Sequence, residues 1–302
     1  MNRTIQQHMI TVPGEHGLFS IEYLTAGQGT PVLLLHGAAD SAQSWQWIMP
    51  HLASEHSLYA LSLPGFGGSD QSARRDYSPR RLTDFVLSFL DYLGLERVSV
   101  IGHSLGGLIA AHLSLQHPIR VVAMALISSA GLGYEVSPMV RKLIVPGAGE
   151  FLSFWCKTPL GAWQWSVGLS QLLFFKTESI PWAWYCQLYR LALIPRYMEA
   201  IVLALRTNNT LWSQWESVIV LDRLHQLTMP VLVLWGDRDQ IFPVRQGQSA
   251  VERLTCGQLI VLPNCGHMAQ VEQSRQVVLA LEVFLAATED RPSKINRASS
   301  CY

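Results

Sequence analysis

Short apolar runs recur along the chain, and each is nearly continuous rather than alternating with polar residues. Such runs are typical of strands that are buried on both faces, as in a parallel sheet. They predict six strands, at residues 32–35, 58–61, 98–101, 122–127, 231–235 and 259–262.

Helical patterns lie between these runs. Over residues 79–93 the apolar side chains recur on one helical face, with Ser78 as a candidate N-cap and Gly94 at the exit. Similar patterns predict helices over residues 105–116 and 275–287. Alternating strands and helices predict an α/β fold, in which helices cover both faces of an open, mostly parallel sheet.

The alternation breaks between residues 134 and 223, where the pattern is helical. This segment holds seven of the ten tryptophans, namely Trp155, Trp163, Trp165, Trp182, Trp184, Trp212 and Trp215. The strand rhythm resumes at Val231. We therefore expect a core domain made of residues 1–133 and 224–287. A helical insertion at 134–223 would cap it, and residues 288–302 would form a flexible C-terminal tail.

The composition narrows the classes of function. Hydrophobic residues make up 49% of the chain and charged residues 15%, which favours a large core over disorder. Lysine and arginine number 22, and so do aspartate and glutamate, so the net charge is zero. Nucleic acid is not an expected partner, because its binding normally requires a basic excess or stripe.

Two features favour a cytoplasmic location. The five cysteines are scattered without a C-x-x-C pair, which favours reduced thiols, and the N-terminus lacks the apolar core of a signal peptide. Residues 158–175 carry no charge and reach the lower length limit for a membrane span. Pro159, Gly161 and Gly168 favour a buried or interfacial element instead.

A serine stands between glycines where the run at 98–101 ends, in Gly102-His103-Ser104-Leu105-Gly106. The motif alone is common by chance, but here it joins a predicted buried strand to an apolar helix. In a sharp strand-to-helix turn, Ser104 would occupy the apex, and Gly102 and Gly106 would remove side chains that clash. The neighbouring helix N-terminus favours developing negative charge. Ser104 is therefore a candidate nucleophile.

A serine nucleophile needs a base, and the base needs an orienting acid. On a sheet of this kind the chain order is serine, acid, histidine. Of ten histidines, only His267 follows both Ser104 and the loop after residues 231–235. That loop contains Asp237 and Asp239, and spacing alone does not separate them.

Acyl transfer also needs backbone N–H groups for the carbonyl oxygen that becomes negative. Leu105, directly after Ser104, supplies one candidate donor. Ala38 supplies the other, in a loop of small residues after the strand at 32–35. We expect His36, at the start of that loop, to brace it rather than to act as a base.

As an ordered set, these motifs resemble the α/β-hydrolase superfamily over roughly residues 10–287. The motifs are His36-Gly37, Pro64-Gly65-Phe66-Gly67-Gly68-Ser69, Gly102-His103-Ser104-Leu105-Gly106-Gly107, Gly236-Asp237-Arg238-Asp239 and Gly266-His267. The resemblance implies that fold, and it makes residues 134–223 a lid over the active site. It also selects Asp239, because the family's acid lies three residues after the glycine that closes its strand.

The superfamily hosts many reactions. Dehalogenases and epoxide hydrolases carry aspartate where this chain has Ser104, which disfavours both. Residues 265–270 resemble carbon–carbon bond hydrolases that act on ring-cleavage products. Those enzymes typically have asparagine before the nucleophile and tryptophan after the histidine, where this chain has His103 and Met268. They also use a lid arginine, and Arg190 is roughly placed for that role.

The features together favour a serine hydrolase of carboxylic esters or thioesters, with Ser104, His267 and Asp239 as its triad. Three alternatives stay open: a carbon–carbon bond hydrolase, a cofactor-free haloperoxidase-like perhydrolase, and a ligand-binding, receptor-like protein of the same fold. The sequence contains no H-E-x-x-H, no Walker loop and no dinucleotide-binding G-x-G-x-x-G after a first strand, so neither a metal nor an organic cofactor is expected.

The aromatic-rich insertion predicts an apolar cleft with few polar anchors. We therefore expect a small-molecule substrate with a hydrophobic acyl or alcohol group. Its candidate contacts are His103, Trp163, Trp165, Arg190 and Met268. The charge-free stretch also makes the insertion a candidate for peripheral membrane contact, while the oligomeric state is left undetermined.

Overall fold

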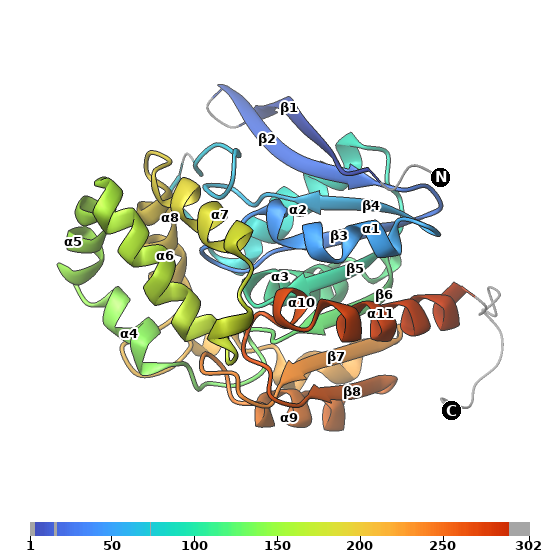
Figure 1. Ribbon diagram of the computed structural model, residues 1–302. Coiled ribbons are helices and arrows are strands. Elements are labelled where there is room, and N and C mark those ends of the chain that lie inside the picture. Colours follow the sequence, from blue (N-terminus) through green and yellow to red (C-terminus); the bar gives the residue numbers. More distant parts are fainter. Residues whose placement is uncertain (1–3, 15–16, 73, 290–302) are drawn as a thin grey trace.

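A computed structural model describes residues 4–14, 17–72 and 74–289, and its centre is an eight-stranded sheet (Figure 1). The strand order is β1-β2-β4-β3-β5-β6-β7-β8. The bounds are β1 Gln6–Gly14, β2 Gly17–Ala26, β3 Thr30–Leu35, β4 His56–Leu61, β5 Val98–His103, β6 Val121–Ile127, β7 Val231–Gly236 and β8 Gly257–Leu262. Strands β3 to β8 pair in parallel, whereas β1 and β2 pair antiparallel. All six predicted strands are confirmed as β3–β8.

The two edges of the sheet depart from the sequence prediction. Strands β1 and β2 were not predicted, because β1 alternates exposed and half-buried residues instead of forming an apolar run. Strand β8 was predicted to be buried on both faces. It lies at the opposite edge of the sheet, and Val261 is 38% exposed.

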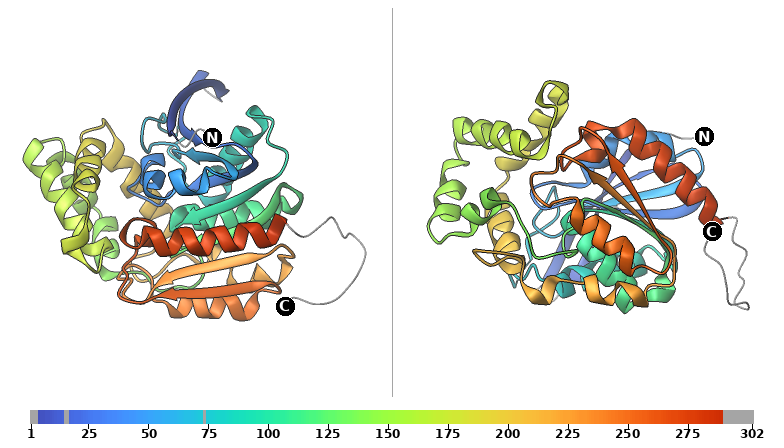
Figure 2. Two further views of the ribbon diagram at one scale, coloured as in Figure 1. Left: turned by 45° about the vertical axis from the view of Figure 1, so that its right-hand side comes forward. Right: turned by 90° about the horizontal axis from the view of Figure 1, so that it is seen from below.

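Helices cover both faces of the sheet, as Figure 2 shows from below. Alternate residues of β3 point to opposite faces: Leu33 and Leu35 pack in the cluster with α2, α3 and α9, whereas Val32 and Leu34 pack in the cluster with α1 and α11. These helices are α1 Met49–Leu52, α2 Pro79–Tyr92, α3 Leu105–Gln116, α9 Arg245–Arg253 and α11 Ser274–Glu289, with α10 Ala269–Glu272 preceding the last. The predicted α/β fold is therefore confirmed.

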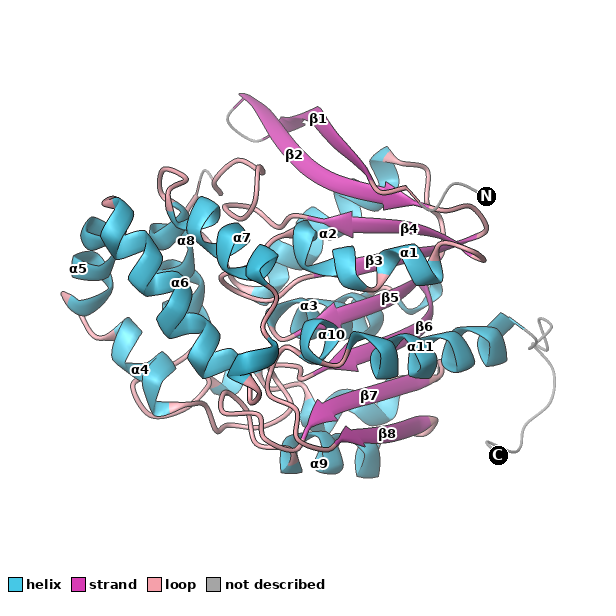
Figure 3. Cartoon of the chain, viewed as in Figure 1, coloured by secondary structure: helices cyan, strands magenta, loops and turns pink. Residues whose placement is uncertain are grey.

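Between β6 and β7 the chain forms five helices, which we call the helical insertion. They are α4 Pro138–Ile144, α5 Ala148–Trp155, α6 Pro159–Leu173, α7 Trp182–Ala192 and α8 Tyr197–Asn208. They gather at the end of the sheet toward which the parallel strands run (Figure 3). Short 3-10 helices lie at η1 Ala42–Trp47, η2 Pro118–Arg120, η3 Thr177–Ser179, η4 Glu216–Val218 and η5 Leu221–Gln226.

Of three expectations about the rest of the chain, one is confirmed and two change. None of the helices in the described ranges is long and apolar enough to cross a membrane, and the charge-free stretch forms α6 instead. Helix α11 continues to Glu289, so residues 288 and 289 are helical, and the remainder of the expected tail lies outside the described residues. Cys156, Cys186 and Cys265 are free thiols, but Cys256 is disulfide-bonded, so the prediction of reduced thiols is wrong there.

The turn from β5 into α3 is sharp and tightly packed. Ser104 has φ 52° and ψ −116°, a conformation that costs a non-glycine residue about 1–3 kcal/mol. A Cβ atom on Gly102 would lie 2.4 Å from the carbonyl oxygen of Gly106, and one on Gly106 would lie 2.1 Å from that of Leu35. The predicted role of both glycines is thus confirmed, and the turn is pressed directly against the end of β3.

We predict that Gly106→Ala destabilises the fold by about 3 kcal/mol or more, because the added methyl meets backbone atoms that have no freedom to move aside. Denaturant unfolding followed by circular dichroism measures the change. Gly168→Ala is the matched control: it lies in α6 with nothing within 4 Å of the new Cβ, so it should be neutral or stabilising by up to ~1 kcal/mol. Equal stability of the two variants would contradict the proposed packing.

Candidate active site

A buried cavity of about 90 Å³ lies between the carboxyl ends of the strands and the helical insertion. The strand side contributes Ala38, Ser104 and His267. The insertion contributes mainly apolar walls, including Val140, Leu143, Trp165, Leu169, Leu172, Leu173, Trp184, Ile201 and Leu205. Ligand sites usually span ~300–1,000 Å³, so this cavity is small. Its small volume indicates that the insertion packs closely against the strand ends.

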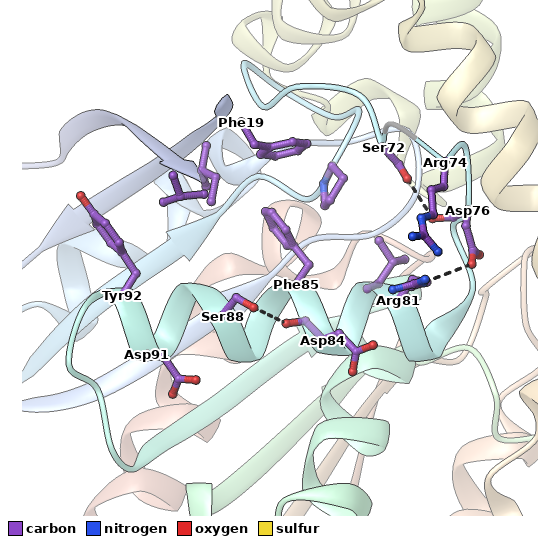
Figure 4. A pocket seen from close by; sticks show the side chains of 14 residues that line it. Phe19, Ser72, Arg74, Asp76, Arg81, Asp84, Phe85, Ser88, Asp91 and Tyr92 are labelled. Carbon is purple, nitrogen blue, oxygen red and sulfur yellow. Dashed lines mark hydrogen bonds and ion pairs between the residues drawn. The ribbon is translucent and has the colours of Figure 1, made fainter. Parts of the chain in front are cut away.

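A larger groove, of about 560 Å³, lies elsewhere, between the β1–β2 hairpin and α2 (Figure 4). Phe19 and Phe85 meet edge to face within it, and Arg81 pairs with Asp76 at 3.7 Å. None of Ser104, Asp239 and His267 lines this groove. The candidate site is therefore the smaller cavity, because Ser104 and His267 line it, although the groove has the larger volume.

The side chain of His267 is held by Asp239. Its Nδ1 lies 2.8 Å from Asp239 Oδ2, and the Asp239 side chain is fully buried. The other carboxylate oxygen, Oδ1, accepts the backbone N–H groups of Ile241 at 2.8 Å and Phe242 at 3.1 Å. Because Asp239 accepts from Nδ1–H, Nε2 of a neutral imidazole carries the free lone pair. His267 is thus arranged to accept a proton at Nε2.

Asp237 lies apart from this pair. Its Oδ1 accepts the backbone N–H of Cys265 at 3.3 Å, and its Oδ2 lies 3.8 Å from the Arg238 guanidinium at the surface. The structure therefore pairs Asp239, and not Asp237, with His267.

His36 braces the loop after β3, as the sequence predicted. Its Nε2 accepts the backbone N–H of Leu63 at 2.9 Å, so Nδ1 carries the proton and donates to the carbonyl of Gly37 at 2.7 Å. Burial lowers the pKa of His36 to about 4. The ring is consequently neutral at physiological pH, and both of its nitrogens are occupied.

His103 joins the end of β5 to the loop that carries His267. Its Nε2 donates to the carbonyl of His267 at 3.0 Å, while Nδ1 is buried without a partner among the described residues. Burial, followed by the neighbouring His267 ring, lowers the pKa of His103. His103 also lines the cavity, so it lies where a substrate contact was expected.

The two expected backbone donors flank Ser104. Leu105 is the first residue of α3, and Ala38 follows Gly37, on which a Cβ would lie 3.0 Å from Ser104 Cβ. Within the described ranges, neither the Ala38 nor the Leu105 amide donates a hydrogen bond to another residue. Both N–H groups are therefore available to a ligand beside Ser104.

Of the other expected substrate contacts, the structure brings Trp165 and Met268 to the cavity. It does not bring Trp163 or Arg190. Two positions apart on an α-helix differ by about 200°, so Trp163 and Trp165 face opposite sides of α6. Trp163 is 36% exposed and packs against Trp182, and Arg190 lies with it on the outer surface of the insertion.

Sequence reasoning missed Asp40, which lines the cavity and is only 3% exposed. Its Oδ1 accepts the N–H of Ser41 at 2.8 Å and the side-chain amide of Gln187 at 3.2 Å. Burial raises its pKa to about 7, against the opposing effect of hydrogen bonds from the Ser44 side chain, the Ser41 amide and Gln187. The available signal was an acidic residue among small residues, in the loop that follows an apolar strand.

The chain is similar to proteins of known family. Residues 32–281 match the alpha/beta hydrolase family. The dihydrolipoyllysine-residue acetyltransferase component of the acetoin cleaving system of Pseudomonas putida is 28% identical over 263 residues. That alignment covers 85% of this chain but 64%, less than two thirds, of the relative. The 2-hydroxymuconate semialdehyde hydrolase of Pseudomonas sp. strain CF600 is 25% identical over 271 residues, covering 87% of this chain and 89% of the relative.

Among solved structures, a membrane phospholipase A described as a bacterial virulence factor superposes with a TM-score of 0.79. The superposition covers 96% of this chain and 88% of the other, at 24% identity, so it shows a shared fold alone. Since the family match spans most of the sequence and the fold agrees with it, the chain belongs to the alpha/beta hydrolase family.

Proposed function

We propose that the protein is a serine hydrolase that cleaves a carboxylic ester or thioester with a hydrophobic acyl or alcohol group. One observation carries the proposal: Ser104, on a strained turn, and His267, held by Asp239, line the same buried and largely apolar cavity.

In the proposed reaction, Ser104 Oγ attacks the ester carbonyl while His267 Nε2 takes its proton. The carbonyl oxygen becomes negative and accepts hydrogen bonds from the Ala38 and Leu105 amides. When the intermediate collapses, the alcohol or thiol leaves with the proton from His267, and the acyl group stays on Ser104. Water then attacks the acyl-enzyme with His267 again as base, which releases the acid and restores the serine.

The surroundings of Asp239 suit its proposed role. Three hydrogen bonds reach its carboxylate, from His267 Nδ1 and from the amides of Ile241 and Phe242. A carboxylate held in this way orients the imidazole and stabilises the positive charge that develops on it.

The cavity supports a hydrophobic substrate group and a lid role for the insertion. Leucines and tryptophans of α6, α7 and α8 form its walls, and its volume is about 90 Å³. A medium-length acyl chain exceeds that space. We therefore propose that residues 134–223 move away from the strand ends to admit substrate.

Carbon–carbon bond hydrolysis is the second candidate, and the similarity to 2-hydroxymuconate semialdehyde hydrolase favours it. Three residues count against it. Arg190 lies outside the cavity, so the lid arginine of that reaction is lacking there, and His103 and Met268 depart from that subgroup's pattern. Perhydrolysis uses the same serine and is a further alternative, whereas a receptor-like protein would bind without turnover.

We predict that a fluorophosphonate probe labels the native protein and fails to label Ser104→Ala. The reason is that the probe phosphonylates an activated serine, and the resulting adduct on the serine is not hydrolysed. The same variant should lose at least about 10⁴-fold of kcat on p-nitrophenyl esters, because it removes the attacking atom. In-gel fluorescence and absorbance assays give the two readouts.

The outcomes separate the candidates. Native protein that does not label would contradict the nucleophile assignment and leave the receptor-like alternative. Labelling together with turnover of ring-cleavage products, but not of esters, would favour the carbon–carbon bond hydrolase.

We predict that Asp239→Asn lowers kcat by about 10⁴-fold, because the amide no longer holds the correct imidazole tautomer. Asp237→Asn is the matched control and should retain kcat to within a few-fold, since Asp237 contacts Cys265 and Arg238 instead. Steady-state kinetics on one ester compare both variants. A large loss at Asp237 alone would reverse the assignment.

We also propose that the outer face of the insertion contacts a lipid surface. Five large apolar side chains of α5–α7 are exposed there: Phe151, Phe154, Leu160, Trp163 and Trp182. Trp163 and Trp182 pack together at 5.5 Å, with Arg190 beside them. Indole rings next to cations are favoured at a bilayer interface, and the arginine suits anionic lipid.

We predict that the protein floats with anionic liposomes in a density gradient, because indole rings partition into the interface. Trp163→Ser/Trp182→Ser should abolish this flotation. Trp212→Ser, which removes an exposed tryptophan of the loop after α8, should leave it unchanged. Absence of native protein from the floating fraction would refute the contact.

A further inference from the structure

Asp40 is a polar residue of the cavity that the proposed reaction does not use. Among the described residues that line the cavity, it alone carries a carboxyl group. It lies two positions after Ala38, in the loop that ends β3, so it is close to the proposed oxyanion donors. Asn209 and His103 are further polar residues of the lining that the reaction does not use, and most of the remaining walls are apolar.

The carboxyl group is held firmly by one oxygen only. Oδ1 accepts from the Ser41 amide and from Gln187 of α7, and Gln187 in turn accepts from the side-chain amide of Gln46 at 3.2 Å. The other oxygen, Oδ2, is buried and has no hydrogen-bond partner among the described residues. Leaving such a group unpaired costs about 1–3 kcal/mol.

A second unpaired group lies near it. The Tyr197 hydroxyl of α8 is fully buried and has no partner within the described ranges. Burial and then the charge of Asp40 raise the pKa of Tyr197. Ile201, one turn further along α8, lines the cavity. Tyr197 is not among the residues that line the cavity, so the group that a polar ligand would meet at this end is the Asp40 carboxyl.

The chemistry of Asp40 selects the kind of ligand group. Burial raises its pKa to about 7, so the acid and the carboxylate are both populated near neutrality. A hydroxyl group donates to the carboxylate and accepts from the acid, so it pairs with either form. A ligand carboxylate would be repelled by the charged form, and no lysine or arginine occurs among the described lining residues to balance it.

We propose that Asp40 is a specificity-determining residue that binds a hydroxyl group of the substrate, so that the preferred esters carry a hydroxyl on their acyl or alcohol part. This inference rests on the proposed ester hydrolysis and adds to it the substrate class. It also predicts that a substrate carboxylate does not bind at this end of the cavity.

Kinetics on matched ester pairs test the inference. The pairs are p-nitrophenyl 3-hydroxybutanoate with p-nitrophenyl butanoate, and glycerol monobutanoate with propyl butanoate. We expect the native enzyme to prefer the hydroxylated ester of at least one pair by about tenfold or more in kcat/KM, because a site built to pair with a hydroxyl discriminates against analogues that lack it. In Asp40→Leu, which is similar in size, the preference should fall to within about twofold.

Two further variants exclude a merely structural effect. Asp40→Asn should keep part of the preference, because an amide both donates and accepts. Asp70→Leu removes a carboxylate that accepts from Ser20 N–H outside the cavity, and it should keep the full preference. Active protein in each sample is counted by fluorophosphonate labelling.

Binding of amide analogues separates this inference from the proposed reaction. The Kd values of 3-hydroxy-N-propylbutanamide and N-propylbutanamide, measured by calorimetry, report the hydroxyl contact without turnover. Absence of both labelling and ester hydrolysis would overturn the hydrolase proposal, while a Kd preference that depends on Asp40 would still support the hydroxyl site. A native protein that prefers neither hydroxylated ligand, or a preference that survives in Asp40→Leu, would overturn the inference.

Discussion

The contact between the β5–α3 turn and the end of β3 is the constraint on which the candidate site depends. Gly106 lies so close to the Leu35 carbonyl that no side chain fits between them, and Gly37 meets Ser104 from the other side. Backbone packing thus presses the loop that carries the Ala38 amide against Ser104. The strained conformation of Ser104 persists because these contacts over-determine it. The geometry around the serine therefore comes from glycine packing rather than from the side chains that would do chemistry.

Burial then gives the ionisable groups at this edge different characters. His36 and His103 are buried without an acidic partner, so burial lowers the pKa of each and keeps both rings neutral. Asp239 and Asp40 are two buried carboxyl groups in different surroundings. Asp239 accepts hydrogen bonds on both oxygens, whereas Asp40 does so on one and has a raised pKa. A difference of this kind allows two carboxyl groups in one site to serve separate tasks.

The helices of the insertion face the cavity on one side and the outer surface of the protein on the other. On α6, Trp165 faces the cavity and Trp163 faces outward, because residues two apart lie on opposite sides of a helix. On α7, Gln187 reaches Asp40 while Arg190 lies on the outer surface. The amino-acid pattern of the insertion is therefore mixed, which is why its tryptophans could not be divided between wall and surface from their number alone.

Local pattern along the chain was enough to predict strands β3–β8, the bounds of α3, the glycine-flanked Ser104 and the eligibility of His267 as the base. Each depends on neighbours along the chain: a continuous apolar run, a turn that needs glycine, or an order of motifs. Strand β1 escaped because it is a half-exposed edge strand, and β2 escaped because Ser20 and Glu22 interrupt its apolar residues. Spacing alone left Asp237 and Asp239 equivalent, and the structure joins only Asp239 to His267, across 28 positions. The tertiary structure alone decided the place of Asp40, whose partner Gln187 is 147 positions away, because local pattern carries no record of which distant side chains pack together.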